Sequence, residues 1–458
     1  MGRAGDELRT RYEDWAKSSA RLHEEASRYL PGGDTRASAH YEPFPLFMSR
    51  GEGCRLWDVD GRELCDFMNN FTSLIHGHAH PPTVRAVSEQ ITRGSAYAAP
   101  TESQIELARM ICERVPSVDE LRFTSSGSEA TNMCLRAARA FTGRPRIVKI
   151  EGGYHGSHEV GEMSLVPLPG KSGPLERPET LPPDRSINAS EVHDVVTIPY
   201  NEVGIARDLL AQHADEVAAV IVEPVLGSMG MIPAAKEFLA TLRELTLEYG
   251  VLLIFDEVIT LRLGPGGVQS RIGVMPDLTA MGKIIGGGLP VGAFGGRREI
   301  IEVFNPHRRD TIMHASTFSG NALTMAAGIA ALGDYGPEQV ERINGLGDRL
   351  RGDLNRAFAD AGIRGTATGL GSILGLHLRT GEIRHARDTL RGIAESGRSM
   401  QLLHLGLLRR GLFMAPRGML CISTAMGEPE IDTAAAAFAD ALVELRPALE
   451  EDCPNLLL

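Results

Sequence analysis

One lysine of the chain stands among residues that could change its chemistry. Lys283 lies in MGKIIGGGLPVGAFGG, residues 281–296, where its neighbours are small or apolar. A lysine removed from water loses its proton near neutral pH, and the neutral amine can form a Schiff base. The glycines of this stretch leave space for a flat group against the backbone. A lysine beside glycines is also typical of a solvated loop, so the neighbouring motifs must decide between these interpretations.

Two upstream motifs supply other groups that a Schiff-base site needs. VLLIFDEV places an apolar run, residues 251–255, before Asp256, and such a run predicts a buried parallel strand. Ligands of open α/β sheets lie at the carboxyl ends of strands, where Asp256 falls. FTSSGSEAT predicts a strand that runs into Ser126, Gly127 and Ser128 and then into a helix with one apolar face. The free N–H groups and positive dipole end of that helix start favour a phosphate.

Together these parts predict a site for pyridoxal 5′-phosphate. Lys283 would hold the aldehyde, Asp256 would keep the ring nitrogen protonated, and the helix start would hold the phosphate. Tyr154 in EGGYHG would stack on the ring, unless it is an ordinary core tyrosine. Val258, two residues beyond Asp256, would face the same side and pack on the other ring face. Glu223 follows the apolar run VAAVIV and also falls at a strand end.

The chain resembles the class III aminotransferases of fold type I, and within them the branch of glutamate-1-semialdehyde aminomutase. The resemblance covers most of residues 28–335 in order, through RGEGCRLWDVDGRELCDF, LRFTSSGSEATNMCLRAARAFTGRPRIVKIEGGYHG, AAVIVEPV, LLIFDEVIT, PDLTAMGKIIGGGLPVGAFGGR and STFSGNALTMAAG. It implies an α/β fold, with a mostly parallel sheet flanked by helices in a large domain and a smaller α+β domain formed by the N- and C-terminal segments. It places Glu223 in the cofactor pocket, as a structural or a catalytic acid. Thr317 matches a threonine that reaches the phosphate of the neighbouring subunit, which implies a homodimer with shared active sites.

On the substrate side, the resemblance points to β-amino acids. GGDTRASAHYEPFPL is similar to the β-amino-acid (β-phenylalanine) aminotransferases of this branch, where the arginine that matches Arg36 holds the substrate carboxylate. Arg417 in APRG matches a second arginine there, used for a dicarboxylate partner. Either arginine could instead form surface salt bridges. Phe71 stands in the substrate pocket where the aminomutase has a tryptophan. Residues 157–171 lack its glycine-serine lid motif, and LRL at 261–263 replaces the glycine-phenylalanine-arginine of many class III members.

The function that these residues predict is ping-pong transfer of an amino group. The donor would be glutamate or a β-amino acid, and the acceptor a carboxylate-bearing keto acid or ketone. Lys283 would form the Schiff base and then shuttle the proton, while Asp256 would stabilise charge through the ring. An intramolecular aminomutase, or a racemase or epimerase, would use the same two residues and remains an alternative. A non-catalytic binding protein of the same fold is disfavoured because both residues are present.

The composition excludes other classes of function. A net charge of −12 and a pI near 5.7 argue against nucleic acid or an anionic membrane as partner. The six cysteines show no CxxC spacing, so free thiols are expected rather than disulfides or a metal site. The N-terminus lacks an apolar signal core, and no stretch approaches the roughly twenty apolar residues of a membrane span. We therefore expect a cytoplasmic protein.

The 458 residues predict more than one domain. We divide them into an N-terminal segment, a large cofactor domain and a smaller C-terminal α+β domain: residues 1–75, 76–335 and 336–458. Hydrophobic periodicity and turn signals predict the main elements. Helices are expected at 6–30, 81–94, 102–115, 237–249, 337–361, 396–410 and 428–448, and strands at 119–124, 146–150, 217–222, 251–255, around 369–378 and 419–424, with a hairpin at Asp60-Gly61. The proline- and serine-rich stretch 163–196 is either a lid or a dimer-covering loop.

Overall fold

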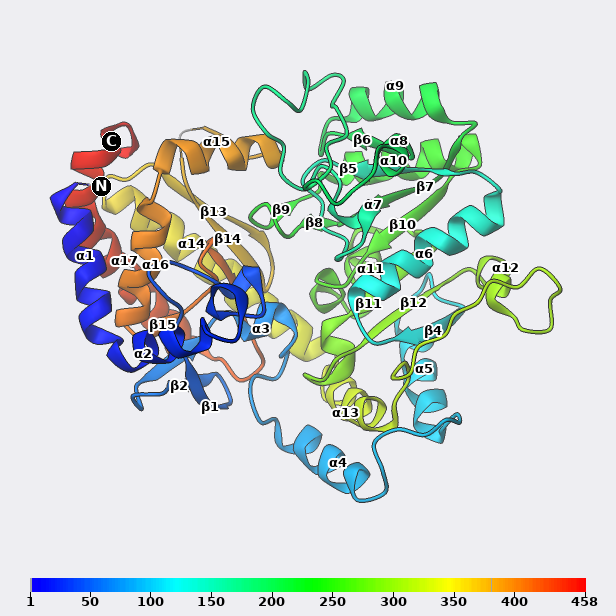
Figure 1. Cartoon of the computed structure of the whole chain (residues 1–458), viewed down its shortest axis with the longest axis horizontal. Helices are drawn as coiled ribbons and strands as arrows, with labels where there is room; N and C mark the ends of the chain where they lie inside the picture. The colour runs from blue at the N-terminus through cyan, green and yellow to red at the C-terminus, as the bar shows by residue number, and fades with distance from the viewer. Residues whose placement is uncertain (1, 380) are drawn as a thin grey trace. The chain divides into compact units, whose positions relative to one another are not determined.

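The computed structural model describes residues 2–379 and 381–458, and the chain divides into two compact units. Unit 1 comprises Met1–His80, Arg342–Glu382 and Thr389–Leu458, and unit 2 comprises Pro81–Glu341 and Ile383–Asp388. Figure 1 shows the course of the chain from the blue N-terminus to the red C-terminus. Both ends of the sequence therefore contribute to unit 1, and the middle of the sequence forms most of unit 2.

Unit 2 is built on a seven-stranded sheet in the order β4-β12-β11-β10-β7-β5-β6. Strands β11, β10, β7, β5 and β6 are parallel neighbours, and β12 is antiparallel to both β11 and β4. All strands except β12 therefore run in one direction, and their carboxyl ends meet at one edge. The strands are β4 (Glu120–Thr124), β5 (Arg146–Ile150), β6 (Val195–Ile198), β7 (Val217–Val222), β10 (Leu252–Asp256), β11 (Leu278–Gly282) and β12 (Gly292–Gly296), with a separate pair β8 (Val225–Leu226) and β9 (Ile232–Pro233).

Helices cover both faces of this sheet (Figure 1). Ile147 and Ile254 belong to the hydrophobic core that α6 covers, whereas their neighbours Val148 and Phe255 belong to the core that α10 covers. Successive strand residues point to opposite faces, so a strand buried on both faces needs an unbroken apolar run. This explains VLLIF and confirms the predicted fold class. The helices are α4 (Pro81–Ile91), α5 (Glu102–Arg114), α6 (Gly127–Thr142), α7 (Glu159–Glu162), α8 (Ala189–His193), α9 (Val203–His213), α10 (Lys236–Tyr249), α11 (Val268–Ile272), α12 (Arg298–Ile301) and α13 (Ala322–Gly333), with short 3-10 turns at Thr260–Leu263, Lys283–Gly286 and Glu302–Phe304.

Unit 1 combines two small sheets with helices. The first sheet has the order β1-β2-β3-β15 and the second the order β13-β14-β16. The strands are β1 (Met48–Glu52), β2 (Arg55–Asp58), β3 (Glu63–Asp66), β13 (Gly365–Leu370), β14 (Ile373–Leu378), β15 (Leu412–Phe413) and β16 (Met419–Cys421). The helices are α1 (Arg3–Trp15), α2 (Lys17–Ala26), α3 (Asn69–Thr72), α14 (Pro337–Asp360), α15 (Ala386–Ser396), α16 (Ser399–Arg409) and α17 (Glu428–Asp452), with 3-10 turns at Pro31–Gly33, Ala37–Ala39 and Pro454–Leu456; α14 and α15 begin in residues assigned to unit 2.

Several predicted elements differ from the structure. The single helix expected at 6–30 is wrong, because the chain breaks at Ala16 (φ −110°, ψ 39°) between α1 and α2. Ala16 and Tyr12 are fully buried in one core cluster, so packing fixes this break. The strand expected around 369–378 is a hairpin of β13 and β14. The sequence reading also missed α15 and β6, and β6 begins inside the stretch 163–196.

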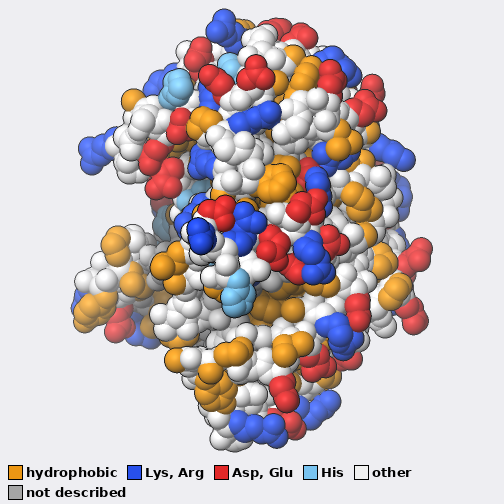
Figure 2. Space-filling view, turned by 90° about the vertical axis from the view of Figure 1, so that its right-hand side faces the viewer, with side chains coloured by type: hydrophobic (Ala, Val, Ile, Leu, Met, Phe, Trp, Pro, Cys, Tyr) orange, Lys and Arg blue, Asp and Glu red, His pale blue; other side chains and the backbone are white. Residues whose placement is uncertain are grey.

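No helix within the described residues is both long enough and apolar enough to cross a membrane. Figure 2 shows one face of the molecule, on which acidic and basic side chains are interspersed. The six cysteines are free thiols, and five of them are buried.

Candidate active site

Lys283 and Asp256 stand at the ends of adjacent parallel strands. Strand β11 ends at Gly282, directly before Lys283, and β10 ends at Asp256. The two strands pair in parallel, with Asp256 opposite Ala280. Burial lowers the pKa of Lys283 below its ordinary value, although the nearby Asp256 and Glu223 carboxyl groups oppose this shift. Asp256 therefore lies at a strand end, as the sequence predicted, and Lys283 follows the end of the adjacent strand.

Two of the five lysines have a lowered pKa, and their hydrogen bonds distinguish them. Burial lowers the pKa of Lys149 to about 7, against the opposing effect of Glu223 and Glu151. Its Nζ already donates to the backbone oxygens of Gly153 and Ile150. By contrast, the Lys283 amine donates no hydrogen bond to any residue in 2–379 or 381–458. Lys283 is therefore the lysine whose nitrogen is free to attack a carbonyl carbon.

A histidine that the sequence reading missed holds Asp256. His155 Nδ1 lies 2.8 Å from Asp256 Oδ2, and the backbone N–H of Val258 donates to Asp256 Oδ1 at 3.1 Å. Burial lowers the pKa of His155, so the ring is neutral and the hydrogen-bond network assigns its proton to Nδ1. His155 Nε2 is buried and has no partner among the described residues. The only sequence feature that could have pointed to His155 is its position directly after Tyr154 in EGGYHG.

The start of α6 has free donors, as the sequence predicted. Ser126 is the N-cap residue, and its Oγ accepts from the N–H of Glu129 at 3.2 Å. The N–H groups of Gly127 and Ser128 precede the first intrahelical bonds and can face an anion. Ser128 Oγ accepts from the N–H of Ser157 at 3.1 Å, which joins the helix start to the loop that carries Tyr154.

Val258 packs closely against Gly127 at this helix start and against Gly282, which precedes Lys283. A Cβ built on Gly127 would lie 3.1 Å from Val258 Cγ1, and one built on Gly282 would lie 3.4 Å from the same atom. The Cβ on Gly282 would also lie 3.7 Å from Gly127 Cα. Because neither glycine has a side chain, Val258 can pack directly on two stretches of bare backbone. The free amine and the helix donors nearby fit a ring that carries an aldehyde and a phosphate.

Glu223 follows β7 and is 5% exposed. Its Oε2 accepts from the N–H of Gly227 at 3.1 Å. Burial, reinforced by the neighbouring Asp256, raises the pKa of Glu223 to about 8. The raised pKa favours the protonated carboxyl, which can donate a hydrogen bond.

The remaining predicted residues are divided between the two units. Tyr154, which is 36% exposed, lies in the loop after β5, and Thr317 is exposed in the segment before α13. Arg36, Phe71 and Arg417 belong to unit 1, whereas the lysine and the aspartate belong to unit 2. Arg417 lies on an exposed turn between β15 and β16.

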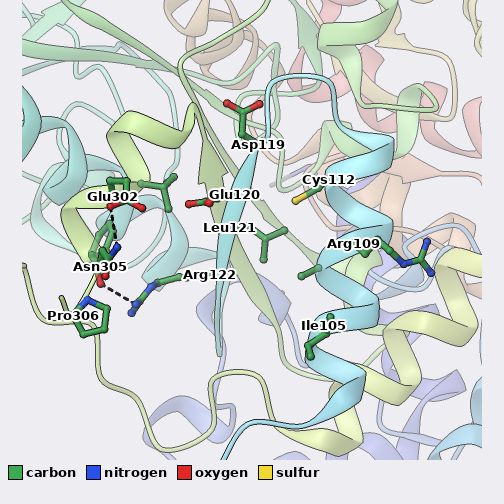
Figure 3. Close-up of a pocket in the computed structure, with 13 residues that line it drawn as sticks. Ile105, Arg109, Cys112, Asp119, Glu120, Leu121, Arg122, Glu302, Asn305 and Pro306 are labelled. Carbon is green, nitrogen blue, oxygen red and sulfur yellow. Dashed lines mark hydrogen bonds between the residues drawn. The ribbon is translucent and has the colours of Figure 1, made fainter. Parts of the chain in front are cut away.

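A separate hollow of about 560 Å³ in unit 2 contains none of these residues (Figure 3). Its walls come from α5, the first residues of β4 and the segment around Glu302–Pro306. Arg122 there donates to the backbone oxygen of Phe304 at 2.9 Å. The hollow lies at the beginning of β4, whereas the candidate active site lies beyond the carboxyl end of β4. The hollow is therefore distinct from the candidate active site.

Comparison with known proteins decides the family. The model of the family Aminotransferase class-III matches residues 36–423, which is most of the chain. The protein is a class III aminotransferase. It is 39% identical to a beta-phenylalanine transaminase from Variovorax paradoxus over 428 residues, 93% of each chain. It is also 39% identical to a glutamate-1-semialdehyde 2,1-aminomutase from Methanothermobacter thermautotrophicus, over 93% of this chain and 99% of that one. Its fold matches the crystal structure of an omega-transaminase from Sphaerobacter thermophilus with a TM-score of 0.88 and 44% identity, over 94% and 98% of the two chains.

The family confirms three predictions from the sequence. This class III aminotransferase has the fold-type I architecture, uses pyridoxal phosphate, and catalyses amino transfer. The free amine, the paired carboxylate and the helix donors of unit 2 are the residues present that fit this cofactor.

Proposed function

We propose that this aminotransferase moves an amino group from a β-amino acid to a carboxylate-bearing keto acid in two half-reactions, with Lys283 as the lysine that binds the cofactor. The observation that carries the proposal is the free amine of Lys283 beside Asp256 at the ends of parallel strands β11 and β10. Bound pyridoxal phosphate supplies an aldehyde and a ring that accepts electrons.

Each protein group then has one task. Lys283 would hold the cofactor aldehyde, and its free amine would take a proton from the substrate carbon that bears the amino group and later give that proton up again. Asp256, oriented by His155, would keep a proton on the ring nitrogen. Tyr154 and Val258 would pack against the ring, and the start of α6 would bind the phosphate.

Arg36 is the proposed binding residue for the substrate carboxylate. A guanidinium recognises a carboxylate through parallel N–H donors, which a lysine cannot offer. Its segment resembles β-amino-acid aminotransferases, and one relative of the whole chain is a beta-phenylalanine transaminase. Arg417 would bind the second carboxylate of a dicarboxylic acceptor, and Phe71 would contact the substrate.

We also propose that the enzyme is a homodimer in which Thr317 of one subunit reaches the phosphate of the other. Thr317 is exposed and lies beside exposed apolar residues, which a second subunit would bury. Large exposed apolar side chains recur in this part of unit 2: Val84 (47%), Ile91 (52%), Ile105 (71%), Met313 (77%) and Phe318 (61%). The six free cysteines agree with a reducing compartment, which supports a cytoplasmic location.

Borohydride trapping tests the identity of the lysine. Reduction of the holoenzyme fixes the cofactor on the nitrogen that holds it, and peptide mass mapping then locates the added mass among the five lysines. We expect the mass on Lys283. Its appearance on Lys149, the other lysine with a lowered pKa, would overturn the assignment. Lys236 is exposed and serves as a control for non-specific labelling.

One relative supports a second candidate function. The aminomutase from Methanothermobacter thermautotrophicus is as similar in sequence as the transaminase. An aminomutase closes its cycle on a single substrate, so turnover without any added keto acid would favour it. Dependence of turnover on both a donor and an acceptor would favour intermolecular transfer.

A further inference from the structure

Unit 1 contains a turn of left-handed backbone that no glycine explains. Helix α3 consists of four consecutive residues with positive φ: Asn69 (46°), Asn70 (47°), Phe71 (54°) and Thr72 (73°). In this region the Cβ of an L-residue approaches the following carbonyl oxygen, so such residues normally occur singly. Strained backbone persists only where its surroundings hold it, and it is concentrated at binding sites.

Buried polar groups hold this turn from within. Asp66 Oδ1 accepts from the N–H groups of Met68 and Asn69, each at 2.9 Å. The side chain of Asn69 in turn donates to the backbone oxygen of Cys421 at 3.0 Å. Both Asp66 and Asn69 are nearly inaccessible to solvent, whereas Asn70 is exposed. The inner contacts therefore fix the turn and leave Asn70 on its outer side.

Arg36 rests on that outer side. Its Nη1 donates to Asn70 Oδ1 at 2.9 Å, and its guanidinium lies 5.9 Å from the centre of the Phe71 ring. Both partners are neutral. Among the residues that the structure describes, no carboxylate forms an ion pair with Arg36. The guanidinium is thus positioned, but its charge is not neutralised by a carboxylate and most of its five donors have no partner among the described residues.

We propose that Asn70 is a positioning residue that orients the Arg36 guanidinium toward the carboxylate of the substrate. The left-handed turn places Asn70 and Phe71 against that guanidinium. The inference rests on the proposed role of Arg36 in carboxylate binding. A neutral amide orients the guanidinium without neutralising it, whereas an aspartate of the same shape would form a charge pair and compete with the substrate. Orientation before binding reduces the entropy lost when a flexible arginine is fixed. The ligand class is therefore an amino donor or acceptor that carries a carboxylate.

A double-mutant cycle on the holoenzyme tests the proposal. We compare Asn70→Asp, Arg36→Gln and the double variant, with β-phenylalanine as donor and a saturating keto acid. Asn70→Asp should raise the KM for the donor about tenfold or more, with kcat within roughly threefold of the parent, because the new carboxylate occupies the guanidinium. In the Arg36→Gln background the same change should have no further effect, since no guanidinium remains. Asn455→Asp adds the same charge at another exposed site of unit 1 and should leave the KM unchanged.

The cycle separates two failures. If Arg36→Gln leaves the donor KM unchanged, the proposed role of Arg36 is wrong and the inference fails with it. If Arg36→Gln raises the KM but the Asn70 effect is the same in both backgrounds, Arg36 binds the carboxylate and the inference alone is overturned.

A second pair of variants tests the backbone. Asn70→Gly and Asn70→Ala both remove the amide, so both should raise the donor KM. Glycine adopts positive φ without strain and alanine does not, so the glycine variant should melt roughly 2 °C or more above the alanine variant. Equal melting temperatures would contradict a left-handed turn at this position.

Discussion

At the scale of single residues, Asp256 depends on a histidine that lies 101 positions earlier in the chain. Replacing His155 with leucine removes a hydrogen bond to a buried carboxylate, which costs about 1.5–3 kcal/mol. We expect the dissociation constant of the cofactor to rise roughly 10- to 100-fold. Equilibrium binding followed by cofactor absorbance measures this change.

Two further variants show whether the N–H of His155 carries the effect. Asparagine places an amide donor near the position of Nδ1, so His155→Asn should retain more affinity than His155→Leu. His193 is exposed, and His193→Leu makes the same replacement away from the site. Equal losses in the asparagine and leucine variants would mean that volume, and not the hydrogen bond, matters at this position.

The predictable site residues are those whose position follows from a strand end or a helix start. Asp256 lies at the end of a strand that its apolar run identifies, and Ser126 lies between a predicted strand and a predicted helix. Lys283 was recognised from its small and apolar neighbours, and the strand β11 before it was not predicted. His155 could not be assigned in this way, because its partner is defined by the folded loop after β5. Lys149 interrupts an apolar strand, and only its buried hydrogen bonds show how the structure accommodates it.

At the scale of elements, the start of α6 combines a stabilising cap with a binding surface. Ser126→Ala removes the cap to Glu129, which should cost about 0.5–2 kcal/mol of unfolding free energy. If the helix start also binds the phosphate, the same variant should lower cofactor affinity. Thermal unfolding of the apoenzyme and cofactor titration separate the two effects.

Asn188 provides the matched control for this prediction. It caps the short helix α8, where its side chain accepts from the N–H groups of Ser190 and Glu191. Asn188→Ala should lose cap stability but leave cofactor affinity unchanged. An equal loss of affinity in both variants would show that destabilisation alone weakens binding.

Long elements with regular periodicity were predictable, and short elements fixed by packing were not. Helices α5, α10 and α14 agree with their predicted spans to within one or two residues, and Gly250 ends α10 in the left-handed conformation (φ 62°). In contrast, β6 has only four residues, which is too few to show a period. The left-handed turn α3 has no pattern in its residue types, because tertiary hydrogen bonds from Asp66 and Asn69 determine it.

At the scale of the whole molecule, unit 1 contains a built-in sensitivity to acid. His404 is fully buried against the ring of Tyr41, and burial lowers its pKa to about 3. The unfolded chain binds this proton below about pH 6.5, whereas the folded chain does not bind it until about pH 3. Folding stability should therefore fall as the pH drops through this window, by about 1.4 kcal/mol per pH unit from this group.

The variant His404→Leu removes the pH-dependent loss of stability that the buried imidazole causes. Between pH 7 and pH 5, its stability relative to the parent should improve by roughly 2 kcal/mol in urea unfolding. A difference that does not change with pH would show that His404 is accessible to protons in the folded protein.

The proposed sharing of active sites between subunits predicts complementation between two inactive variants. Lys283→Ala removes the amine, and Thr317→Arg would block the phosphate contact that we assign to the neighbouring subunit. In a mixed dimer, one site combines the intact Lys283 of one chain with the intact Thr317 of the other. Random reassociation of equal amounts should restore about a quarter of the parental activity. Absence of any recovery in dimers shown to have exchanged would place Thr317 in its own subunit's site, and full activity of the Thr317→Arg variant alone would place it outside both sites.

The half-reaction spectrum of the holoenzyme tests intermolecular amino transfer most directly. The purified enzyme is mixed separately with β-phenylalanine, glutamate and glutamate semialdehyde, without a second substrate, and the visible absorbance of the lysine-bound cofactor is followed. We expect this absorbance to be lost with β-phenylalanine and restored when a keto acid is added. If neither β-phenylalanine nor glutamate changes the spectrum, and the semialdehyde alone is turned over, the enzyme is an aminomutase and the proposed intermolecular transfer is wrong.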